Sequence, residues 1–280
     1  MRDPDFLCFG LPKSGTTMLQ RMLDMHPQVS CPHEQDFIYL ARMMAAVKTG
    51  YNDILAKVDA LTGAQGARPY SDALWMGVLR DALCRMAREA AGEKPIAGLS
   101  DNGVAQTLGL FSGLLPGAKL ILVVRHPLDR ALSSWAHNHR MAARQGNRDH
   151  LKPMEKAGGL GGWIELSARR FVEHLEDAQK LNLGTRLLIL RYEQVIADRR
   201  AALQRIYAHV GARADAALLD DLTVRSGRAA MKATSGDPEF YGSGKAPAAP
   251  DGAAERVERI AGETLARVGY RTPAMAAKGE

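Results

Sequence analysis

The chain has 280 residues, of which 46% are hydrophobic and 24% charged, a balance typical of one globular α/β domain, with or without an insertion. The net charge of +6 suits a polyanionic ligand, but the basic residues are dispersed and aromatics make up only 6%, which argues against a nucleic-acid-binding surface. Three cysteines without a CxxC pair predict neither a disulfide framework nor a zinc site. We expect a cytoplasmic protein without a transmembrane segment, since no signal-peptide pattern opens the sequence and no apolar run approaches the roughly 20 residues that span a bilayer.

The first two predicted elements are a buried parallel strand at residues 6–10 and a helix at residues 15–25, which His26 and Pro27 end. The loop between them belongs to the run PKSGTT, residues 12–17. Free backbone N–H groups and the positive end of the helix dipole converge on such a loop. The sequence therefore predicts an anion-binding site here.

The position of the lysine in this loop narrows the choice of anion. Gly10 and Gly15 have the spacing of a Walker A motif, but Thr16 and Thr17 follow the second glycine and the lysine comes early, at Lys13. A Walker A loop needs its lysine directly after the second glycine. An ordinary nucleoside triphosphatase is thus disfavoured, and a kinase with an aberrant loop is kept as an alternative.

The remaining elements alternate between helices and strands. The periodicity predicts helices at 34–62, 71–91, from 128, 163–180, 198–210 and 253–268, and strands at 118–124 and 186–191. The alternation predicts an α/β fold: a three-layer sandwich with a central parallel sheet flanked by helices, in a P-loop-like arrangement.

A second anion anchor follows the strand at 118–124. Arg125 stands at the carboxyl end of this strand, where open α/β sheets place their ligands. Pro127 suits the first turn of the next helix, and Ser133 lies about two turns along it. An arginine fork and a hydroxyl can together hold a terminal phosphate.

These motifs, with the pair Tyr192 and Glu193 after the third strand, occur in the order and spacing of one family. The chain resembles the sulfotransferases that use 3′-phosphoadenosine 5′-phosphosulfate (PAPS) over most of its length. The resemblance implies a single domain over residues 1–280. It also implies acceptor-site elements around 35–95 and 137–163 and a cofactor-covering loop around 234–252.

The resemblance assigns roles to individual residues. Lys13 and the backbone from Ser14 to Thr17 would hold the 5′-phosphosulfate, Arg125 and Ser133 the 3′-phosphate, and Tyr192 would lie near the adenosine. The implied cofactor-binding residues are Lys13, Ser14, Gly15, Thr16, Thr17, Met18, Arg125, Ser133, Tyr192, Gly244 and Lys245.

Two positions depart from the family pattern. Met18 stands where many cytosolic members stack a tryptophan on the adenine, and a thioether can also pack on the base. The C-terminal clamp on the 3′-phosphate is only partly recognisable. Its arginine is missing, Gly244 aligns with its glycine, and Lys245 is a candidate substitute.

The expected chemistry is in-line sulfuryl transfer that needs no metal, with a base to remove the proton of the acceptor. Carbohydrate-modifying members use a glutamate at a place that Glu34 matches, with His33 and Asp101 in reserve. His137 and His139 have the spacing of a possible metal pair, but a helix places them on different faces. We interpret both as helix-surface or acceptor-site residues.

The acceptor is left open by the sequence, because acceptor pockets are built from variable loops. A hydroxyl or amine of a small-molecule, lipid or sugar-type compound would fit. A basic segment at residues 140–156 could face an anionic acceptor. A catalytically inactive module that binds 3′-phosphoadenosine 5′-phosphate (PAP) is a further alternative.

Overall fold

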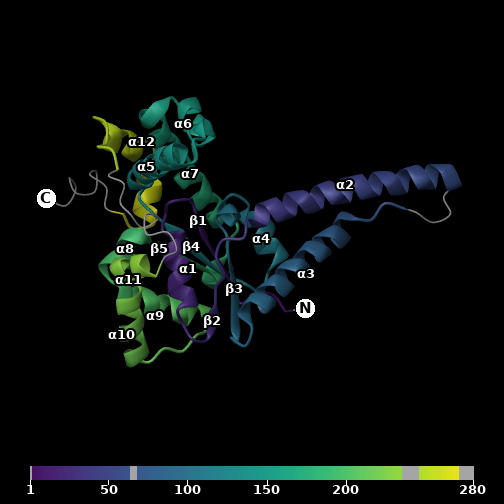
Figure 1. Ribbon diagram of the computed structural model, residues 1–280, viewed down its shortest axis with the longest axis horizontal. Coiled ribbons are helices and arrows are strands. Elements are labelled where there is room, and N and C mark those ends of the chain that lie inside the picture. The colour runs from purple at the N-terminus through teal and green to yellow at the C-terminus, as the bar shows by residue number, and fades with distance from the viewer. Residues whose placement is uncertain (1, 64–67, 235–245, 271–280) are drawn as a thin grey trace.

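A five-stranded sheet forms the centre of the molecule, as Figure 1 shows. The structure is a computed structural model and describes residues 2–63, 68–234 and 246–270. All neighbouring strands pair in parallel, in the order β2-β3-β1-β4-β5. The strands are β1 (Phe6–Gly10), β2 (Val29–Ser30), β3 (Ile96–Ser100), β4 (Lys119–Val124) and β5 (Leu187–Arg191). The α/β sandwich expected from the sequence is confirmed.

Alternation along the strands separates two hydrophobic cores, one on each face of the sheet. Leu7 and Phe9 of β1 face a core shared with α3, α4, α5, α7 and α12. Phe6 and Cys8 face the other core, shared with α1, α9, α10 and α11. The helices are α1 (Thr16–Asp24), α2 (Phe37–Thr62), α3 (Asp72–Ala91), α4 (Leu108–Leu114), α5 (Pro127–Gln145), α6 (Lys152–Lys156), α7 (Gly159–Lys180), α8 (Tyr192–Ala197), α9 (Arg199–Val210), α10 (Ala216–Arg225), α11 (Arg228–Ala233) and α12 (Ala253–Arg267).

Strand β3 was not expected from the sequence, although it lies beside β1 in the middle of the sheet. Its five residues, IAGLS, include a glycine, and glycine lowers the strand propensity of so short a run. The reason for the glycine is tertiary, because a side chain at Gly98 would collide with the ring of Phe6. The short β2 and helices α4, α6, α8, α10 and α11 were likewise absent from the expected elements.

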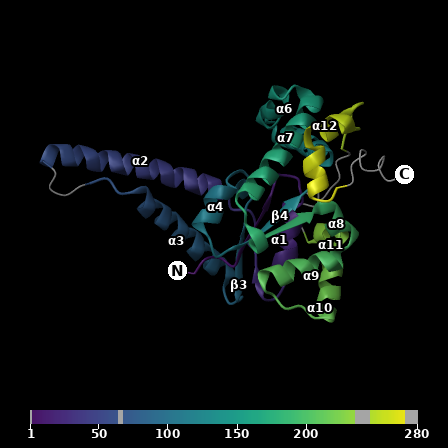
Figure 2. The same cartoon turned by 180° about the vertical axis from the view of Figure 1, so that it is seen from behind.

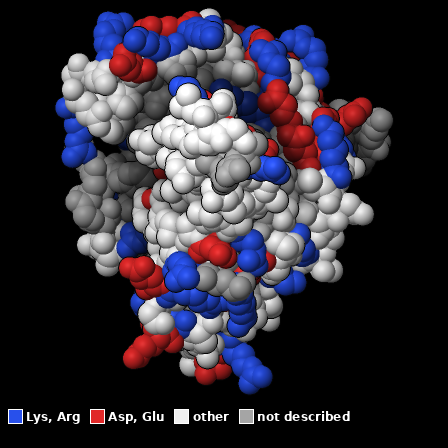
Figure 3. Space-filling view, turned by 90° about the vertical axis from the view of Figure 1, so that its right-hand side faces the viewer, with Lys and Arg blue, Asp and Glu red and all other residues white. Residues whose placement is uncertain are grey.

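A long helical hairpin projects from the body of the protein (Figures 1 and 2). It consists of α2 and the first half of α3, and we call residues 37–62 together with 72–78 the arm. Of the 26 residues of α2, Phe37 at its first position is the buried one. The buried residues of α3 begin at Leu79. The arm therefore joins the core only at its base, where Phe37 is part of the core and Ile38 and Met76 pack against it. Its surface, in the centre of Figure 3, carries few charged side chains.

Despite the length of α2, no described helix combines the length and the apolar character that a membrane span requires.

Candidate active site

The loop after β1 has the backbone of an anion cradle. Gly10 ends β1 so close to β4 that a side chain there would collide with the carbonyl oxygen of Val123. Lys13 and Gly15 both have positive φ, 70° and 99° respectively, and Gly15 precedes the first turn of α1. Ser14 is buried, and its backbone N–H donates to the carbonyl of Leu11 at 3.0 Å. Within the described ranges no side chain caps α1, so the N–H groups of its first turn are available to a bound anion.

Arg125 is brought to this loop by the sheet. Gly10 at the end of β1 pairs with Val123 of β4. The segments that follow these two strands therefore leave the sheet side by side at the same edge. The Arg125 Nη1 donates to the carbonyl oxygen of Lys13 at 3.3 Å. Its Nε is buried without a hydrogen-bond partner among the described residues. A buried, unmatched guanidinium donor is costly in a protein, and an anion beside it would satisfy it.

Tyr192 holds the loop and Arg125 together. The guanidinium carbon of Arg125 lies 4.8 Å from the centre of the Tyr192 ring, in a cation–π contact. The same ring packs so closely on Gly15 that any side chain at this position would collide with it. The structure thus brings Lys13, Gly15, Arg125 and Tyr192 into one cluster.

Helix α5 adds further positive charge to the cluster. Burial, the charge of Arg140 and the charge of Arg125 lower the pKa of Lys13 to about 8. Burial, followed by the charges of Lys13 and Arg140, lowers the pKa of His137 to about 4. Burial is the largest cause of the low pKa of Lys13, and the two arginines add to it. The sequence did not indicate that Arg140 and His137 face Lys13, since this contact depends on how α5 packs.

Ser133 and its neighbour have different environments on α5. Ser134 is buried, and its Oγ accepts from Trp163 Nε1 at 2.8 Å and donates to the carbonyl of Ala131 at 2.9 Å. Ser133 is half-buried. The hydroxyl that is hydrogen-bonded within the helix layer is therefore that of Ser134. The serine predicted to bind phosphate is its neighbour, Ser133.

A hydrogen-bond network at the start of α5 was not predicted from the sequence. Glu193 Oε1 accepts from the backbone N–H of His126, which begins α5, at 3.0 Å. Glu193 Oε2 accepts from the hydroxyl of Tyr270 at 2.7 Å. The Tyr192–Glu193 pair thus positions two neighbouring parts of the site, the arginine and the helix that follows it. The sequence around Tyr270 did not indicate this contact, because its hydrogen-bond partner Glu193 lies 77 residues away.

Glu34 lies at the same edge of the sheet, beyond β3. Its Oε2 accepts from Asn102 Nδ2 at 2.9 Å, and its Oε1 accepts from the Asn102 backbone N–H at 3.3 Å. Partial burial and the negative charge of Asp101 raise the pKa of Glu34, while the hydrogen bonds from Asn102 act against the rise. A carboxylate with a raised pKa, held in place by a neighbour, has the character of a general base.

The two reserve candidates differ from Glu34. Asp101 is buried at 2% exposure, and its carboxylate accepts from the backbone N–H of Phe37 and, at 2.6 Å, from that of Gly103. Burial raises its pKa as well. These contacts fix the start of α2 against the end of β3. His33 is exposed.

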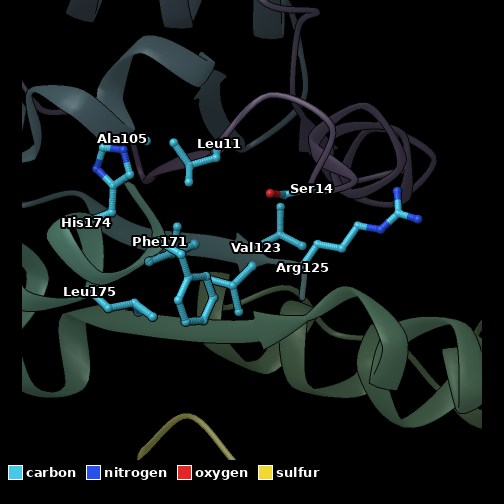
Figure 4. A pocket seen from close by; sticks show the side chains of 10 residues that line it. Leu11, Ser14, Ala105, Val123, Arg125, Phe171, His174 and Leu175 are labelled. Atoms are coloured by element: carbon cyan, nitrogen blue, oxygen red, sulfur yellow. The ribbon is translucent and has the colours of Figure 1, made fainter. Parts of the chain in front are cut away.

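A small cavity lies under the loop, between the sheet and α7 (Figure 4). Its volume is about 10 Å³, which is room for about one water molecule. Leu11, Phe171 and Leu175 are among its mostly apolar lining residues, and the Arg125 side chain extends away from it. A ligand of nucleotide size therefore has no room beneath the loop and must lie on its outer side.

Three further residues were predicted to bind the cofactor: Met18, Gly244 and Lys245. Met18 is 9% exposed and belongs to the core on the α1 side of the sheet. Gly244 and Lys245 lie outside the described residues.

The parallel sheet, the loop after its central strand and the arginine after the adjacent strand define an α/β protein with a P-loop-like fold. A sequence model of the sulfotransferase family matches residues 4–216. The chain therefore belongs to the sulfotransferase family, whose members are transferases.

Solved structures share the fold at low sequence identity. The sulfotransferase STF9 from Mycobacterium avium has a TM-score of 0.54 and 16% identity, covering 97% of this chain and 78% of its own. The sulfotransferase domain of the curacin biosynthetic pathway has a TM-score of 0.52 and 17% identity, covering 98% and 100%. A retinol dehydratase in complex with androsterone and the inactive cofactor PAP has a TM-score of 0.51 and 18% identity, covering 98% and 84%. No curated protein sequence matches the chain.

Proposed function

We propose that the protein transfers the sulfuryl group of PAPS to a hydroxyl or amine of an acceptor and releases PAP. The observation that carries the proposal is the contact between Arg125 and the Lys13 backbone, which joins two phosphate anchors on adjacent strands. The unmatched Nε of Arg125 and the lowered pKa of Lys13 both fit a ligand with two separate anionic groups. A solved structure of the same fold contains PAP, which supports this cofactor.

Each residue of the site would have a separate role in the transfer. PAPS, as co-substrate, would supply the sulfuryl group and carry its leaving phosphate. Lys13 and the N–H groups of residues 14–17 would stabilise the negative charge that builds on that phosphate. Arg125 and Ser133 would hold the 3′-phosphate, and the ring of Tyr192 keeps Arg125 in place. Glu34 would take the proton of the acceptor group.

The acceptor would reach this site between the base of the arm and helices α5 to α7. Figure 3 shows the surface hollowed between the arm and the helices above it, with basic side chains in the hollow. Residues 35–95 and 137–163 supply these two walls, which agrees with their proposed role as acceptor elements of a single domain. A small-molecule, lipid or sugar-type acceptor would fit, and a cytoplasmic location stays a prediction from the sequence.

Replacement of Arg125 by alanine tests the cofactor assignment. Charge-assisted hydrogen bonds contribute about 1.5–3 kcal/mol, so we expect the affinity for PAP to fall by roughly 10- to 100-fold. Adenosine 5′-phosphate lacks the 3′-phosphate, and its affinity should change much less. The measurement is calorimetric titration of both ligands and of ATP in EDTA.

The matched control is Arg148→Ala, which removes an exposed arginine that pairs with Glu155 at 3.3 Å. It should bind PAP as the unmodified protein does. An Arg125→Ala protein that still prefers PAP over adenosine 5′-phosphate by the original factor would refute the assignment. ATP binding restored by Mg²⁺ would favour a kinase, and PAP binding without turnover of any acceptor would favour an inactive binding module.

The affinity for PAP should depend on pH through Lys13. An anion beside this lysine favours its charged form and raises its pKa from about 8, so the ligand binds best to protein already protonated there. The affinity should therefore fall as the pH rises above about 8, with proton uptake on binding. Calorimetry in two buffers of different ionisation enthalpy measures that uptake. A Lys13→Arg protein, whose guanidinium stays charged, should lose this pH dependence, and a dependence that persists in it would assign the effect to another group.

A further inference from the structure

The arm carries an apolar stripe that the described part of the chain leaves largely exposed; within it, the ring of Tyr51 contacts the rings of Tyr70 and Trp75, each at a centroid distance of 6.3 Å. Along α2 the stripe comprises Tyr39, Met43, Val47, Tyr51, Ile54, Val58 and Leu61, each between 39% and 85% exposed. Their spacing of three or four residues places them on one side of the helix. The side that faces α3 is different, since Lys48 pairs with Asp72 at 2.7 Å and Asn52 bonds to the Tyr70 backbone there.

The size of this surface is that of a protein interface. With Tyr70, Leu74 and Val78 beside it, the stripe leaves apolar area on the order of 800 Å² exposed, about what one partner contributes to a standard interface. Monomeric proteins rarely expose a contiguous apolar patch of more than a few hundred Å². Figure 3 looks along the arm toward the body of the protein; the end of the arm that it shows is mostly white, and the charged side chains gather above and below it.

The stripe has nearly the same spacing when it is followed in either direction from Gly50. Val47 and Ile54 lie three residues before and four after this glycine, and Tyr39 and Leu61 lie eleven residues from it on either side. A glycine inside a helix costs about 1 kcal/mol relative to alanine. No atom of the described chain lies within 4 Å of the place where a side chain at Gly50 would begin. The glycine therefore leaves open space at the middle of the stripe, where another backbone can approach closely.

From these features we infer that a second copy of this chain covers the stripe. The two α2 helices run antiparallel and cross at Gly50, about a two-fold axis. Each Val47 faces the Ile54 of the other copy, and each Tyr39 faces the other Leu61. Such an interface is self-complementary, as a two-fold dimer requires. It leaves both anion loops on the bodies of the protein, away from the contact.

The first test is the mass of the full-length protein in solution. We expect a dimer at about 10 µM by sedimentation equilibrium, and monomers for Val47→Glu and Ile54→Glu, with a dissociation constant raised at least about 100-fold. The control Val224→Glu changes an equally apolar residue on α10 that is 75% exposed, and it should stay dimeric. PAP binding serves as the folding check, because the stripe lies outside the loop and Arg125.

The second test locates the axis with single cysteines. In the antiparallel pair Gly50→Cys should form a disulfide with its own copy, whereas Leu61→Cys should not, because its two copies lie roughly 30 Å apart. The native cysteines Cys8, Cys31 and Cys84 are buried and do not interfere. Unmodified protein that is monomeric, dimers that survive both glutamate variants, or efficient linkage through Leu61→Cys would each overturn the inference. Binding of monomers to phosphatidylcholine vesicles through the stripe would replace it with a lipid surface.

Discussion

A Lys13→Met protein should keep its fold and lose turnover of PAPS by about 10²- to 10³-fold, the effect of removing one aimed electrostatic group from a transition state. Lys13 is in the left-handed region with φ 70°, and its backbone carbonyl accepts from Arg125. Methionine keeps the length of the side chain and the backbone contact but removes the charge. The loss should therefore fall mainly on kcat, because the charge on the leaving phosphate grows during the reaction.

The measurement is single-turnover kinetics with PAPS, together with the affinity for PAP. A Lys13→Arg protein keeps a cation and should recover part of the rate. The control Lys180→Met removes a lysine whose side chain is 70% exposed and pairs with Asp177, and it should leave the rate unchanged. If kcat of Lys13→Met stays within a factor of two, the lysine only contributes to binding and the proposed role is wrong.

Replacement of Glu34 by glutamine should lower kcat by about 10²- to 10⁴-fold and leave the affinity for PAP unchanged, as removal of a general base does. Glutamine can still accept from Asn102, so the local structure should persist. The raised pKa of Glu34 also predicts the pH profile. The base is active when ionised, so the rate should fall as the pH drops through that pKa, and this acid limb should vanish in Glu34→Gln.

The neighbouring carboxylate provides the comparison for this prediction. Asp101→Asn replaces one of the two oxygens that accept from backbone N–H groups by an amide NH₂ at a buried site, so its loss of activity should come with a lower Tm, whereas Glu34→Gln, at an exposed site, should melt as the unmodified protein does. His33→Gln should be close to neutral for an exposed side chain. Full activity of Glu34→Gln would transfer the role of base to one of these two residues.

The sequence predicted those features whose signal is local. The strand at residues 6–10, the loop with Lys13, and Arg125 at the end of the next apolar run are each specified within about ten residues. The parallel sheet then brings the loop and the arginine together, because β1 and β4 are neighbours. Family membership, the fold and the transferase class followed from these few residues, while the roles of the individual site residues stay predictions.

What the sequence could not predict depends on contacts between distant segments. Strand β3 was missed because Gly98, which weakens its strand signal, is needed for the ring of Phe6. The hydrogen bond from Asn102 to Glu34 joins residues 68 apart, and the approach of Arg140 to Lys13 requires α5 to be packed on the sheet. Neither periodicity nor motif spacing contains such information. The exposed stripe of the arm is visible as a pattern, but a helix buried in a core would have shown the same pattern.

The hydrogen bond from Tyr270 to Glu193 can form only late in the synthesis of the chain. Residues 4–216, which match the family, leave the ribosome before α12 and Tyr270 do. Until then Glu193 holds the start of α5 without the hydroxyl that fixes its second carboxylate oxygen. We expect a nascent chain to form the sheet early but to acquire a properly set phosphate anchor only when synthesis is nearly complete. A ribosome that stalls before α12 would thus display a chain whose strands have been made, but whose core lacks α12 and whose proposed phosphate anchor lacks the hydrogen bond from Tyr270.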